Sequence, residues 1–212
     1  GQNVRLSLDA DLQILAQDLL EGHEGAAVLV DAHTGEVLAM ASSPTFDSGS
    51  VVEDWEALRN AEDAPLLNRA TRGLAQPGLI IAPVILAEAW EAGEAIAPSG
   101  PLTSSIQVDG SEVGCVWSPQ GPGWQSVLAA QCPAPIARAG ETLTDTTLTQ
   151  IFSKWGLTDA PPFTLPTVAV DEDPSGTEQT QEAIGQGALL VTPLQMVRVS
   201  AAIANDGAVP PL

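Results

Sequence analysis

Leucines recur at helical spacing close to the start of the chain. They are three or four positions apart, the period that places side chains on one face of a helix. Asp9 stands where a carboxylate would accept hydrogen bonds from the first backbone N–H groups of that helix, and Gly22 is a typical end signal. The pattern therefore predicts an amphipathic helix that begins after Asp9 and carries Leu12, Leu15 and Leu19.

Two apolar runs follow the first helix and predict a β-hairpin. They cover residues 26–31 and 36–41, and Gly35 lies in the short turn between them. Both runs are nearly continuous in apolar residues rather than alternating. We therefore expect both faces of this hairpin to be covered by helices.

Four later segments have helical patterns. They are residues 79–91, 124–130, 145–155 and 192–204. Pro83 falls in the first turn of its helix, where the missing N–H costs nothing. Residues 43–63, 97–125 and 159–180 are rich in proline, glycine and polar residues, so we predict loops there, with weak strand character in the second.

Charge narrows the possible partners. The chain has 27 acidic and 7 basic side chains and a formal net charge of −20. A surface this acidic repels phosphates, which excludes nucleic acid and disfavours anionic lipid headgroups. We interpret the charge as a contribution to solubility rather than as a site for one cationic partner.

The only cysteines are Cys115 and Cys132. Two cysteines are too few for a disulfide framework or a zinc site. They could form one bridge if the chain is exported, or remain two free thiols. The sequence leaves both alternatives open.

The sequence excludes several kinds of chemistry. Lys154 is the only lysine, Ile151 precedes it where Ser-x-x-Lys needs serine, and Trp155 follows it. Neither a Lys-Thr-Gly motif nor a phosphate-binding Gly-Lys loop is therefore present. His23 and His33 fall in expected turns and are interpreted as surface residues. The acidic run at residues 171–173 lacks the spacing of a calcium loop, so we expect neither a metal nor a cofactor.

Three separated segments resemble one family. They are residues 25–44, residues 68–71 with Pro77-Gly78, and residues 183–196 with Ala-Ile-Gly-Gln-Gly and Thr-Pro-Leu-Gln. In this order they resemble the first hairpin, the approach to the active-site helix and the segment before the last motif of a class B penicillin-binding protein transpeptidase domain. The resemblance extends from about Val4 to Pro211.

The resemblance implies an α+β fold of the DD-transpeptidase and serine β-lactamase type, with an antiparallel sheet flanked by helices. Residues 1–212 are then expected to form a single domain that lacks the C-terminal strands of this sheet. The Lys-Thr-Gly strand would come after Leu212. The resemblance also implies a location outside the cytoplasm, with membrane attachment through an N-terminal segment outside this chain.

The family's catalytic side chains are replaced at the matching positions. Its serine and lysine correspond to Leu79 and Ala82, and the serine and asparagine of its Ser-x-Asn motif correspond to Gln131 and Pro133. An isobutyl or methyl group cannot form or activate an acyl-enzyme. We expect Leu79 and Ala82 to fill the former cleft, although a cleft repurposed for an apolar ligand is the alternative.

These replacements predict a transpeptidase-like domain without catalysis. It would act as a scaffold, as a partner-binding module or as a sensor of muropeptides. Its expected partners are cell-wall or cell-division proteins or peptidoglycan fragments. The alternative is a hydrolase or other enzyme with different chemistry on the same scaffold. A hydrolase that uses paired carboxylates is one example, and it would require an open, polar cleft.

Overall fold

A computed structural model of the chain describes residues 3–93, 98, 105–143, 145–170 and 178–212. The chain forms two compact units. The first comprises Gly1–Ala75, Asp159–Ala169 and Val191–Leu212, and the second comprises Gln76–Thr158 and Val170–Leu190. The fold is α+β, with small antiparallel sheets flanked by helices, which confirms the expected class.

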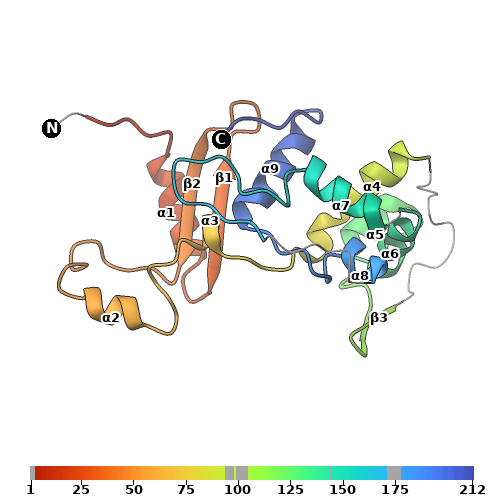
Figure 1. The fold of residues 1–212 in the computed structure, drawn as a ribbon, viewed down its shortest axis with the longest axis horizontal. Helices are drawn as coiled ribbons and strands as arrows, with labels where there is room; N and C mark the ends of the chain where they lie inside the picture. Colours follow the sequence, from red (N-terminus) through yellow and green to blue (C-terminus); the bar gives the residue numbers. More distant parts are fainter. Residues whose placement is uncertain (1–2, 94–97, 99–104, 144, 171–177) are drawn as a thin grey trace. The chain divides into compact units, whose positions relative to one another are not determined.

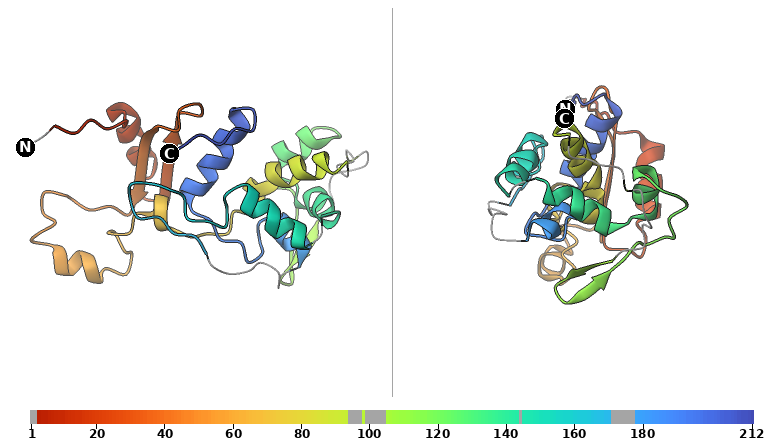
Figure 2. Two further views of the ribbon diagram at one scale, coloured as in Figure 1. Left: turned by 45° about the horizontal axis from the view of Figure 1, so that its top comes forward. Right: turned by 90° about the vertical axis from the view of Figure 1, so that its right-hand side faces the viewer.

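The first unit is built on the predicted hairpin. Strands β1 (Gly25–Val30) and β2 (Val37–Ser43) pair antiparallel. Helix α1 (Ala10–Leu19) contacts β2, and α9 (Pro193–Ala204) contacts β1, so the two helices lie on opposite sides of the hairpin (Figures 1 and 2). The unit also holds α2 (Trp55–Asn60) and α3 (Arg69–Arg72).

The helix ends of this unit follow the sequence signals. The Asp9 carboxylate accepts from the N–H groups of Asp11 and Leu12, at 3.0 Å each. Thr192 and Gln195 form a capping box at the start of α9, where each side chain bonds to the other residue's backbone. These caps confirm the predicted starts of α1 and α9.

The outer edge of β2 is occupied by the segment around α1. Gln13 donates to the carbonyl of Met40 at 2.9 Å and accepts from its N–H at 2.8 Å. The Ser7 hydroxyl donates to the Val37 carbonyl at 2.7 Å, and the Asp9 N–H donates to the Leu38 carbonyl at 2.8 Å. These bonds engage the carbonyls of Val37 and Leu38 and both backbone groups of Met40, so part of this edge is closed to a neighbouring strand.

Coverage of the hairpin is less complete than the sequence predicted. In β2, Val37, Ala39 and Ala41 are buried, but β1 has no buried residue and Leu29 is 45% exposed. The reason is that β2 is the only strand paired with β1 in the described part of the chain.

The second unit is mostly helical. Its elements are η1 (Gly78–Ile81), α4 (Ala82–Glu91), β3 (Ile106–Val108), β4 (Ser111–Val113), α5 (Trp124–Ala130), α6 (Pro133–Glu141), α7 (Asp145–Lys154) and α8 (Gln179–Ala183). Helix α6 contacts both α4 and α8, and α7 also contacts α8 (Figure 1). Most residues of α6 are buried, so it forms the centre of this unit.

Four helices differ from the sequence-based prediction of loops or were not predicted, and one of them is the single turn of α3. Helix α2 lies inside the polar segment 43–63, and α8 lies at the end of the proline-rich segment 159–180. Helix α6 was not predicted, because Pro133 and Pro135 are typical of a chain that breaks helices. Both prolines lie in its first turn, where no N–H partner is needed.

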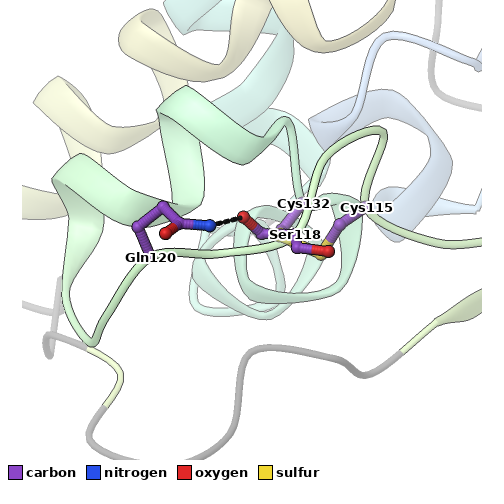
Figure 3. Close-up of a disulfide and its surroundings, with 4 residues drawn as sticks. All are labelled: Cys115, Ser118, Gln120 and Cys132. Carbon is purple, nitrogen blue, oxygen red and sulfur yellow. Dashed lines mark hydrogen bonds between the residues drawn. A yellow bond between two sulfur atoms is a disulfide. The ribbon is translucent and has the colours of Figure 1, made fainter.

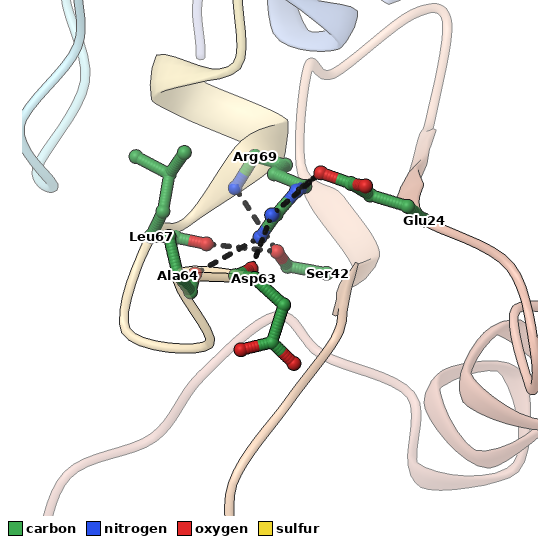
Figure 4. A network of polar contacts seen from close by, with 6 residues as sticks. All are labelled: Glu24, Ser42, Asp63, Ala64, Leu67 and Arg69. Carbon is green, nitrogen blue, oxygen red and sulfur yellow. Dashed lines mark hydrogen bonds and ion pairs between the residues drawn. The ribbon is translucent and has the colours of Figure 1, made fainter. Parts of the chain in front are cut away.

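Arg69 ties α3 to three other segments of the first unit (Figure 4). Its guanidinium donates to the Glu24 carboxylate at 2.8 Å and to the carbonyls of Asp63 and Ala64 at 2.6 and 3.1 Å. Its backbone N–H donates to the Ser42 hydroxyl at 3.0 Å. Arg69 is only 8% exposed, so its buried guanidinium is satisfied by the Glu24 carboxylate and these two carbonyls.

We predict that Arg69→Ala lowers the free energy of unfolding of the chain by about 2–4 kcal/mol, because two carbonyls and a carboxylate lose their charged donor. Arg69→Lys should fall between this variant and the parent, since an ammonium cannot reproduce the fork geometry. Arg72→Ala, an exposed position on the same helix, is the control and should change stability by less than about 0.5 kcal/mol. Chemical denaturation checks all three, and equal stability of the two alanine variants would contradict the role of Arg69.

Candidate functional site

The start of the helix that resembles the active-site helix is fixed by a contact between two glycines. Gly78 and Gly185 have φ angles of 58° and 66°, which favour glycine. The Gly78 N–H donates to the Gly185 carbonyl at 2.9 Å. A Cβ on Gly185 would collide with the backbone of Gly78, so the two chain segments approach this closely only without side chains.

A buried carboxylate shapes the loop that carries Gly185. Glu182 is 2% exposed, and its carboxylate accepts from the N–H of Ala188 at 2.6 Å and of Leu189 at 3.4 Å. A Cβ on Gly187 would collide with this carboxylate. The Gln76 amide also donates to the Gly187 carbonyl at 2.8 Å. Glu182 thus holds the loop in place, and its oxygens are engaged by backbone N–H groups.

Three of the four positions that the sequence analysis matched to the family's motifs come together around one small cavity. Leu79 in η1, Ala82 at the start of α4 and Gln131 after α5 line it. The other lining residues are Val127, Leu128, Cys132 and Ile136. Pro133, the fourth of these positions, is not in this lining and is buried at the start of α6.

The cavity is small, and its lining has no reactive side chain. Its volume is about 20 Å³, close to the space of one water molecule. Gln131 has the only polar side chain in the lining, and an amide is neither a nucleophile nor a base near neutral pH. Ala82 is 2% exposed, so the position that the sequence analysis matched to the family's lysine lies inside the core.

A disulfide adjoins the cavity (Figure 3). Cys115 is bonded to Cys132, which is fully buried and lines the cavity next to Gln131. The backbone N–H groups of Val116 and Trp117 donate to the carbonyls of Gln131 and Ala130, at 3.4 and 3.1 Å. The segment that starts at Cys115 is therefore held against the end of α5 by one covalent and two hydrogen bonds.

The chain's single lysine is used elsewhere. Lys154 at the end of α7 bonds to Glu88 and Glu91 of α4, with Nζ–O distances of 2.8 and 3.2 Å. Hydrogen bonds to Glu88 and then to Glu91 raise the pKa of Lys154 above its ordinary value. The Trp155 indole donates to the same Glu88 at 2.7 Å. Lys154 does not line the cavity beside Leu79, so it supplies no base there.

The histidines take the positions that the sequence predicted. His23 and His33 are both exposed in turns. At the hairpin turn the Asp31 carboxylate accepts from the N–H groups of Thr34 and His33, each at 2.8 Å. The hydrogen bond from Thr34 and then that from His33 lower the pKa of Asp31 below its ordinary value. The role of Asp31 is to close the turn.

No group of three or more metal-ligating side chains occurs in the described residues. The acidic run at residues 171–173 lies outside them. Among the same residues, no helix has the length and apolar character needed to cross a membrane.

The comparisons with known proteins identify the family. The model of the penicillin binding protein transpeptidase domain matches residues 25–212, and the chain belongs to this family. Peptidoglycan D,D-transpeptidase PbpA of Mycolicibacterium smegmatis is 30% identical over 98% of this chain and 47% of its own length. The corresponding enzyme MrdA of Acinetobacter baumannii is 29% identical over 98% of this chain and 34% of its length. The chain therefore spans less than half the length of these curated relatives.

Solved structures have the same fold. PBP2 of Pseudomonas aeruginosa matches with a TM-score of 0.80 and 26% identity, over 100% of this chain and 53% of that one. Penicillin-binding protein A of M. tuberculosis, solved as a ceftriaxone acyl-enzyme, also gives a TM-score of 0.80, at 22% identity and the same coverage. The resemblance deduced from the three sequence segments is confirmed.

We predict that restoring the family's lysine is destabilising. Ala82→Lys would place an ammonium group in the core and should lower the free energy of unfolding by about 2–5 kcal/mol. Ala87→Lys, at an exposed position of the same helix, is the matched control and should change it by less than about 0.5 kcal/mol. Urea denaturation compares the two, and equal stability would show that the core accommodates the charge.

We predict that the denatured, unreduced chain contains no free thiol. The loop between Cys115 and Cys132 spans 17 positions, so reduction should lower stability by about 3 kcal/mol in the chain-entropy model. The Cys115→Ala/Cys132→Ala variant should show the same loss without reductant. Thiol titration and denaturation measure these effects, and two titratable thiols in the untreated chain would contradict the bridge.

Proposed function

We propose that this chain is a penicillin-binding protein transpeptidase domain that has lost acyl transfer and acts without catalysis. Its role would be that of a scaffold, a partner-binding module or a muropeptide sensor in peptidoglycan-related processes. The family membership supports the link to peptidoglycan, since the curated relatives carry the name peptidoglycan D,D-transpeptidase.

The composition of the small cavity carries this proposal. Acyl transfer needs a nucleophile and a group that takes its proton. Leu79 and Ala82 supply neither, and the remaining lining adds only the Gln131 amide. A volume of about 20 Å³ also leaves no space for a peptide substrate beside Leu79.

Carboxylate chemistry at this position has no support. Glu182 is the one buried carboxylate among the described residues, and backbone N–H groups engage it. It does not line the cavity. A hydrolase would need two carboxylates facing a common cleft, and no such pair lies beside Leu79.

The proposed setting is outside the cytoplasm. The Cys115–Cys132 bridge suits an oxidising compartment. Attachment to the membrane would then depend on a segment outside this chain.

Partners would be cell-wall or cell-division proteins or peptidoglycan fragments, and the net charge of −20 disfavours nucleic acid. We also propose that residues 1–212 work as part of one domain, although they pack as two compact units.

The decisive test is incubation with penicillin G followed by intact-mass measurement. We expect no added mass, because no side chain in the cavity can attack the β-lactam carbonyl. Penicillin-binding protein A of M. tuberculosis, solved as a penicillin G acyl-enzyme, is the positive control. A covalent adduct on this chain would refute the proposal, and peptide mapping would identify the residue that carries it.

A further inference from the structure

The second unit has a much larger hollow than the cavity beside Leu79. Its volume is about 710 Å³, within the range of small-molecule sites. It lies between the loop that follows Cys115 and helix α5. The residues on which its chemistry depends are Trp117, Gln120 and Gln125.

The walls of this hollow are fixed. The disulfide and the hydrogen bond from the Trp117 N–H to the Ala130 carbonyl hold the loop at one end (Figure 3). Within the loop, the Gln120 amide donates to the Ser118 carbonyl at 3.0 Å. At the other end, Gly123 has a φ angle of 90°, which favours glycine and turns the chain into α5. A site built this way needs little ordering when a ligand binds.

The lining combines an aromatic face with uncharged polar groups. Trp117 is 65% exposed, a large apolar area to leave in water. Gln120 and Gln125 supply amides. The lining contains no charged residue, in a chain that has 27 acidic side chains.

Ser126 contributes to the wall of the hollow rather than to its hydrogen-bonding groups. Its Oγ is buried and has no hydrogen-bond partner among the described residues. A hydroxyl that is closed to water is also closed to a ligand in the hollow. The polar side chains that a ligand can reach are therefore the exposed amides of Gln120 and Gln125.

We propose that this hollow binds an uncharged saccharide. A sugar ring has an apolar C–H face that covers an indole, and it has hydroxyl groups that bond to amides such as those of Gln120 and Gln125. Anionic ligands find no cation in the lining and meet the field of a chain with net charge −20. A purely apolar peptide would remove water from the amides without replacing their hydrogen bonds.

The site is separate from the replaced motifs. The hollow shares no lining residue with the cavity beside Leu79. Saccharide binding therefore depends on neither the presence nor the loss of acyl transfer. The β-lactam experiment and the saccharide experiment can each fail without the other.

The test is isothermal titration calorimetry of the full 212-residue chain with chitotetraose, cellotetraose and maltotetraose. Tetragalacturonate and a decaproline peptide serve as anionic and peptide comparisons. We expect at least one uncharged tetrasaccharide to bind with a Kd of about 0.1–1 mM, and neither comparison ligand to bind at about 5 mM.

Four variants locate the site. Trp117→Ala should weaken binding by about tenfold or more, whereas Trp117→Phe, which keeps an aromatic face, should retain most of it. Trp90→Ala is the matched control, since Trp90 is also 65% exposed but lies on α4 outside the hollow, and it should bind like the parent. Gln125→Ala should weaken binding severalfold without lowering the melting temperature, because it removes an exposed amide from the lining.

Some outcomes would overturn the proposal. They are the absence of binding by all three uncharged saccharides, equal binding by the parent and Trp117→Ala, and preferential binding of tetragalacturonate or decaproline. The melting temperature of each variant shows whether it is folded, and the exposed position of Trp117 makes large destabilisation unexpected. Trp117→Phe keeps the proposal testable even if the alanine variant does not fold.

Discussion

The contact between Gly78 and Gly185 is the constraint on which the second unit depends. It brings two backbone segments, far apart in sequence, to a separation that no side chain would permit. The beginning of η1 and the loop after α8 are thereby placed together. A second close approach extends the arrangement, because a Cβ on Gly140 of α6 would collide with Ala183 of α8. The Gln179 amide adds a hydrogen bond of 2.9 Å to the Gly140 carbonyl. The positions of these helices therefore follow from missing side chains as much as from apolar contacts.

The frame of the fold is specified by residues outside the small cavity. It is held by glycines, caps and buried polar anchors such as Arg69 and Glu182, which bond mainly to the backbone. The side chains of Leu79 and Ala82 take no part in those contacts. The helix start therefore does not depend on a polar side chain at either position. As apolar side chains, Leu79 and Ala82 stabilise the second unit through packing.

The sequence predicted those elements whose signals are local. The caps at Asp9 and Thr192 and the apolar periodicity of α1, α4 and α9 depend only on neighbouring residues, and the corresponding helices form as predicted. Helix α6 escaped prediction because its prolines are acceptable only where a first turn already exists, and buried contacts with α4 and α8 provide that context.

The candidate site was likewise predictable from the sequence only in part. The motif comparison located Leu79, Ala82 and Gln131, but the size of the cavity between them is set by side chains from α5 and α6. The pairing of Cys115 with Cys132 depends on how the loop returns to the end of α5, so the sequence left it open. The hollow beside Trp117 had no sequence signal, because its polar groups come from a loop and a helix whose mutual position follows from tertiary packing.

The hydrogen bonds from the segment around α1 to the outer edge of β2 have a consequence for how the sheet can be extended. Ser7, Asp9 and Gln13 use the backbone groups of β2 that face away from β1. A further strand therefore finds fewer free backbone groups beside β2 than beside β1, so the edge beside β1 is where the sheet extends more readily. Edge-to-edge chains of hairpins need two open edges per molecule. By engaging both backbone groups of Met40, Gln13 makes one of these two edges a poor place for strand addition.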